Sequence, residues 1–258
     1  MNFKDFRSLK VGIKGDILKA IILAAGTGTR LMPLTKDIPK PLLKIGDISL
    51  LERMIINCIF NGIEEFIIVI GHKKERVIEE RNYLVNKYNI KIDIVENKEY
   101  STTNTSYSVN LATNQLNDDI IIINGDNVID HRIISGLLNN DKTSLVVDND
   151  KELSEESFKI KIENNIIIEI GKGIDVNTAS GEFIGISKVS KKDLPIFNFI
   201  LKELIAENFQ NYYDLAYKKL SKKVNIDYFY TNGLKWTEID DKSDWEYAHT
   251  LVHEFDSY

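Results

Sequence analysis

Cysteine is almost absent from this sequence of 258 residues, with Cys58 the single instance. One cysteine allows no internal disulfide and no cysteine-rich zinc site, so both kinds of cross-linked scaffold are excluded. Cys58 follows Met54 and Ile55 at helical spacing, which predicts a small buried apolar residue and not a nucleophile. Long apolar runs are also lacking, because none approaches the roughly 18 residues that a membrane-spanning helix needs.

An excess of positive charge is missing too. Lys and Arg number 33 against 39 Asp and Glu, and the net charge is −6. Nucleic-acid binding draws its affinity mainly from clustered Lys and Arg, so we expect neither a nucleic-acid partner nor a membrane partner. Residues 1–17 mix charged and apolar side chains without the continuous apolar centre of a secretory signal. We therefore expect a cytoplasmic protein made of an N-terminal extension, 1–17, and a single domain, 18–258.

Strand-like apolar runs alternate with helical patterns in the first half of the chain. Ser49 with Glu52 three residues later resembles a capping box at the start of a helix, and Asn61-Gly62 ends that helix. The predicted strands are Lys19–Ala24, Phe66–Ile70, Ile90–Val95 and Ile120–Ile123, and the predicted helices are 50–60, 74–88 and 105–116. This alternation predicts an α/β fold with a Rossmann-like, mostly parallel sheet flanked by helices.

In parallel sheets of this kind the ligand site lies beyond the carboxyl ends of the strands, so we expect the loops after Ala25, Val95 and Ile123 to converge. From about Thr143 onward, short apolar runs separated by turns such as Asn164-Asn165 predict an antiparallel layer beside the parallel sheet. The predicted strands there are 158–162, 166–170, 182–189, 225–230 and 235–239, and the predicted helices are 194–207, 212–221 and 243–252.

A loop rich in small residues follows the first predicted strand. It reads Leu23-Ala24-Ala25-Gly26-Thr27-Gly28-Thr29-Arg30 and continues to Thr35, with Pro39-Lys40-Pro41 shortly after. Small residues let the backbone approach a triphosphate closely, and Arg30 and Lys40 add positive charge. A dinucleotide-binding protein would have a third glycine where Thr29 stands and an acidic residue near Ile70-Gly71-His72, so that class is excluded. The glycines alone would also suit an ordinary turn.

The whole string resembles the signature of the nucleotidyltransferase superfamily that includes the sugar-1-phosphate pyrophosphorylases. The resemblance implies the nucleotide-diphospho-sugar transferase fold, nucleotide binding by Leu23 to Thr29, and an enzyme that transfers a nucleoside monophosphate and releases pyrophosphate. It also implies that Arg30 and Lys40 are catalytic residues, which stabilise charge on the phosphates.

Two aspartates stand where the superfamily has metal ligands. Asp126 follows the strand Ile120–Ile123 in the string Asn124-Gly125-Asp126, and Asp240 closes Trp236-Thr237-Glu238-Ile239-Asp240, with Asp244 nearby. Carboxylate oxygens suit Mg²⁺, and the resemblance implies that this cofactor is held by both aspartates. The alternative is that each aspartate caps the helix that follows it.

The segment Glu99 to Val109 resembles the Asn-rich segment of cytidylyltransferases that act on phosphocholine and on 2-aminoethylphosphonate. Relatives of these enzymes serve inositol phosphate and a phosphorylated glutamine that decorates capsules, so the resemblance implies CTP as substrate and a role in capsule or cell-surface modification. It implies nucleotide contacts from Asn104, Thr105 and Ser106. Phe158 stands where methionine is common, and Asp214 where glutamate is common, so the acceptor stays open.

Several residues of the second half are candidates for the acceptor side. Lys172 aligns with the lysine of the superfamily's second phosphate site and is a third catalytic candidate, although a solvated hairpin lysine would fit as well. Tyr212, Tyr213 and Asp214 are able to bind an amine through aromatic faces and a carboxylate, or the tyrosines pack in the core. Two further candidates for acceptor binding are Lys159 and Glu182.

These features predict that an oxygen of a small phosphorylated or phosphonate acceptor attacks the α-phosphorus of CTP and displaces pyrophosphate. No protein nucleophile is required. One alternative is a sugar-1-phosphate uridylyl- or thymidylyltransferase. Another is a non-catalytic, nucleotidyltransferase-like regulatory subunit, which would have lost the charged residues that are kept here.

Overall fold

Four parallel strands form the first half of the central sheet in the computed structural model, which describes residues 18–255. The predicted N-terminal extension, residues 1–17, lies outside the described residues. The four strands are β1 (Lys19–Ala24), β4 (Glu65–Ile70), β5 (Lys91–Glu96) and β6 (Ile120–Asn124), in the order β5-β4-β1-β6. Their runs of Ile and Val suit strands that are covered on both faces.

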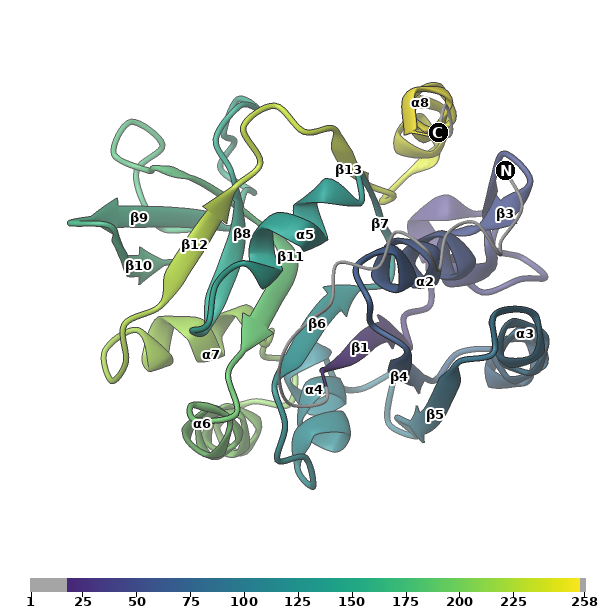
Figure 1. Cartoon of the computed structure of the whole chain (residues 1–258), viewed down its shortest axis with the longest axis horizontal. Coiled ribbons are helices and arrows are strands. Elements are labelled where there is room, and N and C mark those ends of the chain that lie inside the picture. Colours follow the sequence, from purple (N-terminus) through teal and green to yellow (C-terminus); the bar gives the residue numbers. More distant parts are fainter. Residues whose placement is uncertain (1–17, 256–258) are drawn as a thin grey trace.

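Helices cover both faces of this sheet (Figure 1). Alternate residues of a strand point to opposite faces, so Ala20 and Ile22 of β1 belong to one apolar core and Ile21 belongs to the other. The first core includes residues of α2 (Leu50–Phe60), α3 (Lys74–Tyr88) and α5 (Arg132–Leu138). The second includes residues of α4 (Thr105–Thr113), α6 (Leu194–Glu207) and α7 (Asp214–Leu220).

The second half of the sheet is mainly antiparallel and is joined to the first by one long strand. This strand, β11 (Gly181–Val189), pairs with β6, β8 (Ser144–Asp148) and β9 (Lys159–Glu163). The outer strands are β10 (Ile166–Ile170) and β12 (Asp227–Tyr230), and β12 runs parallel to β8. The α/β fold with an antiparallel layer is therefore confirmed.

Two small sheets complete the fold. β7 (Asn127–Ile129) pairs antiparallel with β13 (Trp236–Glu238), which brings the C-terminal part of the chain to the end of β6. The hairpin of β2 (Lys44–Ile45) and β3 (Ile48–Ser49) packs with α8 (Lys242–Phe255) in a third, smaller core. Single 3₁₀ turns form at Thr29–Leu31 and Lys40–Leu42.

The structure corrects several details of the sequence prediction. Ser49 Oγ accepts the backbone N–H of Glu52 at 3.1 Å, as a capping box requires. The Glu52 carboxylate, however, accepts bonds from Tyr88 and Lys87 and joins α2 to α3, so the box is only half formed. Strands β2, β3 and β7 and helix α5 were not predicted, and α4 ends at Thr113 rather than 116. Cys58 is buried, as predicted.

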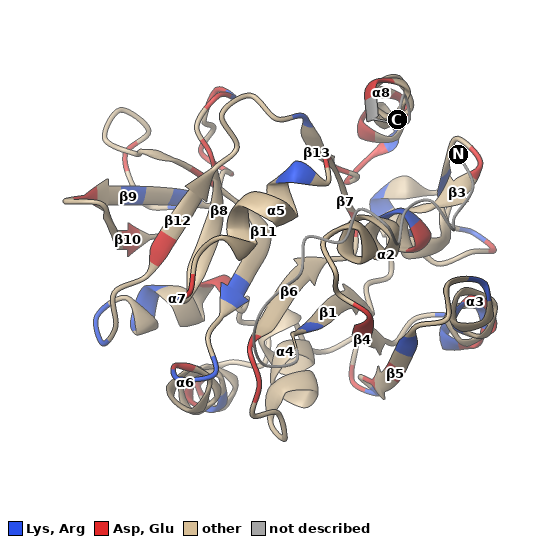
Figure 2. Ribbon diagram, viewed as in Figure 1, with Lys and Arg blue, Asp and Glu red and all other residues tan. Residues whose placement is uncertain are grey.

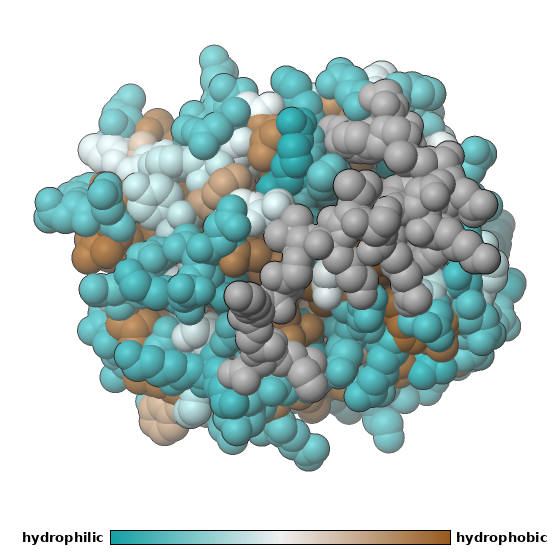
Figure 3. Space-filling model, in the orientation of Figure 1, coloured by the Kyte–Doolittle hydropathy of each residue, from teal (hydrophilic) through white to brown (hydrophobic). Residues whose placement is uncertain are grey.

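Charged residues of both signs are interspersed along the ribbon in Figure 2. On the face that Figure 3 shows, apolar residues lie in scattered small areas among hydrophilic ones. Within residues 18–255, no helix combines the length and the apolar character needed to cross a bilayer.

Gly125, just after the end of β6, lies directly against the end of β1, and this close approach generates a stability prediction. Its N–H donates to Leu23 O at 3.0 Å, and a Cβ added there would lie 2.2 Å from that same oxygen. We expect Gly125→Ala to lower the free energy of unfolding by about 1–3 kcal/mol, because two strand ends would have to separate. Urea denaturation would measure it. Gly173→Ala is the control, since a Cβ there meets nothing within 4 Å; equal losses in both variants would contradict the prediction.

Candidate active site

Two cavities open at the carboxyl ends of β1, β5 and β6, with volumes of about 860 and 390 Å³. They share wall residues that include Gly26, Asn104 and Asp126, so they form one continuous cleft. The predicted convergence of the loops after the first, third and fourth parallel strands is confirmed. The smaller cavity lies against the glycine-rich loop, and the larger one extends toward α4, α7 and β11.

The glycine-rich loop forms a wall of this cleft. All eight residues from Leu23 to Arg30 line one or both cavities. Gly28 has a φ of 63°, in the left-handed region that glycine adopts without strain, and its carbonyl accepts the Thr35 hydroxyl at 2.8 Å. An exposed loop of small residues, fixed by such a bond, is suited to close contact with phosphate oxygens.

Four charged side chains meet beside this loop. The ammonium group of Lys40 lies 2.6 Å from Asp126 and 3.4 Å from Asp240, and Arg30 lies 2.7 Å from Asp240. Burial by itself lowers the pKa of Lys40, but the charges of Asp126 and Asp240 outweigh burial and raise this pKa above its ordinary value. Lys40 therefore stays charged and holds the two carboxylates together.

The backbone explains why the two aspartates meet. Asp126 leads from β6 into β7, and its carbonyl accepts the N–H of Ile239 at 3.0 Å, next to the pairing of β7 with β13. Because a strand follows Asp126, it does not cap a helix. At the start of α8 the capping acceptor is Asp241, whose Oδ1 accepts the N–H groups of Ser243 and Asp244. The carboxylate of Asp240 is left facing Arg30 and Lys40.

The pair of aspartates supplies the protein's part of the oxygen ligands that a hard cation takes. Asp126 Oδ1 is buried and has no hydrogen-bond partner among the described residues. No group of three or more His, Cys, Asp or Glu side chains is arranged to hold a metal within 18–255. Mg²⁺ commonly takes one or two carboxylates and completes its shell with substrate phosphates and water, which is the arrangement that these two aspartates fit.

Residues 19–147 match the Nucleotidyl transferase family. The chain belongs to this family. The match confirms the family expected from the sequence, and with it the class of nucleotidyltransferase enzymes.

Two curated relatives and one solved structure illustrate the similarity. The chain is 33% identical over 223 residues to the "Bifunctional protein GlmU" of Methanococcus aeolicus, which covers 86% of the chain and 51% of GlmU. It is 29% identical over 253 residues to the CTP:phosphoglutamine cytidylyltransferase of Campylobacter jejuni, covering 89% and 98% of the two chains. The inositol-1-phosphate CTP transferase from T. maritima superposes with a TM-score of 0.80 at 23% identity, covering 95% and 98%. The chain spans about half the length of the first curated relatives it matches.

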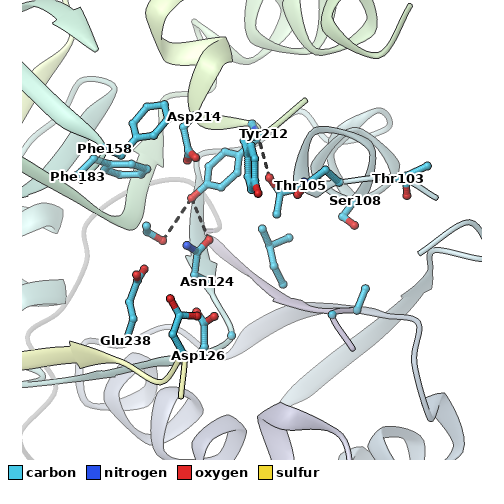
Figure 4. Close-up of a pocket in the computed structure, with 18 of the residues that line it drawn as sticks. Thr103, Thr105, Ser108, Asn124, Asp126, Phe158, Phe183, Tyr212, Asp214 and Glu238 are labelled. Atoms are coloured by element: carbon cyan, nitrogen blue, oxygen red, sulfur yellow. Dashed lines mark hydrogen bonds between the residues drawn. The ribbon is translucent and has the colours of Figure 1, made fainter. Parts of the chain in front are cut away.

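In this nucleotidyl transferase chain, hydroxyl and amide groups from β5 and α4 form one side of the larger cavity. Asn97 follows β5, and its side-chain amide donates to Thr103 Oγ1 at 3.0 Å and to Ser108 Oγ at 3.1 Å. Asn104 and Thr105 also line the cavity, but Ser106 is fully buried and is not part of the wall. Figure 4 shows Thr103, Thr105 and Ser108 along this side. Of the three nucleotide-binding residues predicted in this segment, the structure thus brings two to the cleft.

Aromatic residues and a carboxylate form the opposite side. Asp214, at the first turn of α7, lies near Phe158, Phe183 and Tyr212 in Figure 4, and all four line the cavity. Burial raises the pKa of Asp214 to about 7, and the charge of Lys172 offsets only part of that rise. Within the described chain no cation lies within 4 Å of this carboxylate.

The remaining acceptor-side candidates differ in their positions. Glu182 and Tyr213 both line the cavity. Tyr213 is nevertheless only 1% exposed, because it packs against Phe183, and its hydroxyl lies 3.3 Å from both Asn124 Oδ1 and Gly185 O. Lys159 is fully buried, and its ammonium group donates to three carbonyls of the loop 154–157, so the structure keeps it away from the cavity.

Lys172 does line the cavity, where its ammonium group lies 2.8 Å from Glu156. Glu156 was not among the residues singled out from the sequence, because nothing in a loop of Glu and Ser distinguishes it.

Glu238 was also not assigned from the sequence. It lines the larger cavity near Asp126 (Figure 4). Burial, followed by the charges of Asp126 and Asp240, raises the pKa of Glu238 to about 8. A signal that could have identified Glu238 is its spacing from Asp240, because residues two apart in an extended chain point to the same side.

The raised pKa of Asp214 generates a prediction about stability. Between the ordinary aspartate pKa of about 4 and the folded-state value of about 7, the folded chain binds more protons than the unfolded chain, so burial of this carboxylate costs stability increasingly as pH rises. We expect the melting temperature of Asp214→Asn, relative to that of the wild type, to rise as the pH increases from 5 to 8. Each kcal/mol of burial cost that the substitution removes should raise it by about 2–4 °C. Calorimetry at four pH values would measure the gain.

Asp47→Asn is the matched control, because Asp47 is exposed and outside the cavity. A difference between Asp214→Asn and the wild type that is the same at pH 5 and pH 8 would contradict the prediction.

Proposed function

We propose that this chain is a CTP-dependent cytidylyltransferase that transfers CMP to a small, non-sugar phosphorylated or phosphonate acceptor and releases pyrophosphate. The observation that carries the proposal is the cleft itself. At one end Arg30 and Lys40 meet Asp126 and Asp240 beside the glycine-rich loop, and at the other end Asp214 lies among aromatic rings.

The nucleotide assignment rests on the side of the cleft formed by β5 and α4. The base of CTP presents an amino donor together with ring acceptors. Asn97 donates to the hydroxyl oxygens of Thr103 and Ser108 and so fixes both in the cavity wall, and a hydroxyl group is able to accept or to donate. A site that hydrogen-bonds the cytosine amino group rejects UTP, because the uracil carbonyl leaves buried acceptors unpaired. Two of the similar proteins carry CTP in their names, which supports this choice.

The proposed reaction is an in-line displacement. An acceptor phosphate or phosphonate oxygen forms a bond to the α-phosphorus, and the bond between that phosphorus and the bridging oxygen of the β-phosphate breaks. The electron pair of the broken bond leaves with pyrophosphate. Arg30 and Lys40, beside the glycine-rich loop, stabilise the charge on the departing oxygens. The acceptor oxygen is already ionised at neutral pH, so no side chain has to remove a proton.

Asp126 and Asp240 are the residues that would hold Mg²⁺, together with phosphate oxygens of the nucleotide. A divalent cation bound there would supply Lewis-acid stabilisation of phosphate charge. Positive charge from such a cation would also neutralise the carboxylates that now share Lys40, and Lys40 would be able to turn toward the phosphates.

The acceptor assignment rests on Asp214. A half-buried carboxylate with aromatic neighbours and no close cation is matched by a ligand that brings an ammonium or amide group. An ammonium group of the acceptor, bound there, would favour the ionised form of Asp214, which burial disfavours. Lys172, at the same end of the cleft, is positioned for the acceptor phosphate, and Glu182 is a further acceptor-binding candidate.

A screen for pyrophosphate release tests this function. CTP, UTP, dTTP, ATP and GTP would each be supplied with phosphocholine, 2-aminoethylphosphonate, phosphoglutamine, inositol phosphate and glucose-1-phosphate. We expect fastest release with CTP and an acceptor that carries an amine or amide. Fastest release with glucose-1-phosphate and UTP or dTTP would identify a sugar nucleotidyltransferase instead, and no release from any pair would favour a regulatory subunit.

The aspartate pair generates a second prediction. We expect Asp126→Asn and Asp240→Asn each to lower Mg²⁺-dependent turnover by roughly 10²-fold or more, because an amide keeps the shape but loses the anionic oxygen that a hard cation prefers. Steady-state kinetics with thermal unfolding would separate loss of activity from loss of fold.

Asp241→Asn is the matched control for these variants. It removes the same charge next to Asp240 but retains a good helix cap, so turnover is expected to stay near that of the wild type. Comparable losses in Asp240→Asn and Asp241→Asn would argue against the metal assignment.

A further inference from the structure

The acceptor end of the cleft contains an ion pair whose role the proposed reaction does not explain. Lys172, in the connection between β10 and β11, donates to Glu156 at 2.8 Å, and both residues line the larger cavity. The Glu156 side chain is 88% exposed and that of Lys172 is 54% exposed. An ion pair this exposed contributes little to folding stability, so stability alone does not account for its position in the cavity.

The buried side chain of Lys159 fixes the loop that carries Glu156. Lys159, at the start of β9, donates to the carbonyl oxygens of Ser154 at 3.0 Å, Glu155 at 3.2 Å and Ser157 at 3.4 Å. Lys159 is fully buried, and an ammonium group there requires such partners. Three carbonyls on one cation fix the backbone on both sides of Glu156. Its carboxylate is therefore presented to Lys172 by a fixed loop.

We propose that Glu156 occupies the acceptor-phosphate position on Lys172 in the empty enzyme and competes with the acceptor for it. This inference rests on the proposed function, because it takes Lys172 to be the cation that receives the acceptor phosphate. The carboxylate offers Lys172 the same partner chemistry as a phosphate oxygen, namely an anionic acceptor of N–H bonds. It keeps the ammonium group at the cavity wall and yields to a ligand of higher charge.

The competition has a defined energetic scale. Measured exposed pairs typically contribute about 0.2–1 kcal/mol. The upper part of that range, about 0.4–1 kcal/mol, corresponds to about two- to five-fold in a binding constant. Removal of the Glu156 charge should therefore tighten binding of a phosphate group at Lys172 by about two- to five-fold. The bond-breaking step is not expected to change, because Glu156 leaves Lys172 before the phosphate arrives.

A protection experiment tests the inference without any need for turnover. Lys172 would be acylated with an amine-reactive ester in increasing inorganic phosphate, and its modification quantified by mass spectrometry in the wild type, Glu156→Gln and Glu155→Gln. Glu155 is the matched control, being an exposed glutamate of the same loop that does not line the cavity. We expect the half-protecting phosphate concentration to fall by about two- to five-fold in Glu156→Gln and to stay unchanged in Glu155→Gln.

Three outcomes would overturn the inference: no protection of Lys172 by phosphate in the wild type, no shift in Glu156→Gln, or the same shift in both variants. In a kinetic measurement with CTP and the best acceptor, we expect Glu156→Gln to have a lower KM for the acceptor than the wild type, by the same factor, and an unchanged kcat. If no acceptor is used, the proposed function fails while the protection result still stands. If turnover is found but neither protection nor KM changes, only the role of Glu156 fails.

Discussion

Two carboxylates at the end of a sheet repel each other unless a cation lies between them, and here the ammonium group of Lys40 does so for Asp126 and Asp240. Three distant segments meet through this contact: the region after the glycine-rich loop, the end of β6, and the end of β13. The short β7–β13 sheet supplies the backbone geometry, and Lys40 neutralises the charge that this geometry concentrates. The rest of the cleft is arranged around this point.

The parallel half of the fold was predictable because its signals are local. Ile120 to Ile123 is apolar at every position, as a strand covered on both faces requires, and Gly125 and Asp126 follow where such strands end. The short sheet was not predictable in the same way. β7 has three residues, and its pairing with β13 depends on a contact more than a hundred residues along the chain. The nearness of Asp126 to Asp240 therefore followed only from the resemblance to a family.

Helix and strand periodicity determines which of the candidate side chains face the cavity. Thr105 and Ser108 are three residues apart on α4 and share a face of the helix, whereas Ser106 is turned about 100° away, into the core. Phe158 and Lys159 are neighbours at the start of β9, so their side chains point to opposite sides. Phe158 lines the cavity and Lys159 cannot. Glu156 carries no such signal, because its position depends on carbonyl bonds to a buried lysine.

The two sides of the cleft are mechanically joined, although they differ in chemistry. The backbone N–H of Tyr213 donates to Thr105 Oγ1 on the nucleotide side, and its hydroxyl reaches Asn124, two residues before Asp126. Asn124 in turn lies so close to Gly185, where φ is 74°, that a Cβ there would lie 2.2 Å from the amide nitrogen. Since Asp214 directly follows Tyr213, the carboxylate of the acceptor side is fixed relative to the aspartate pair. A half-buried carboxylate with no cation in contact is unfavourable in the empty protein, so its rigid placement reserves that position for a ligand that carries positive charge.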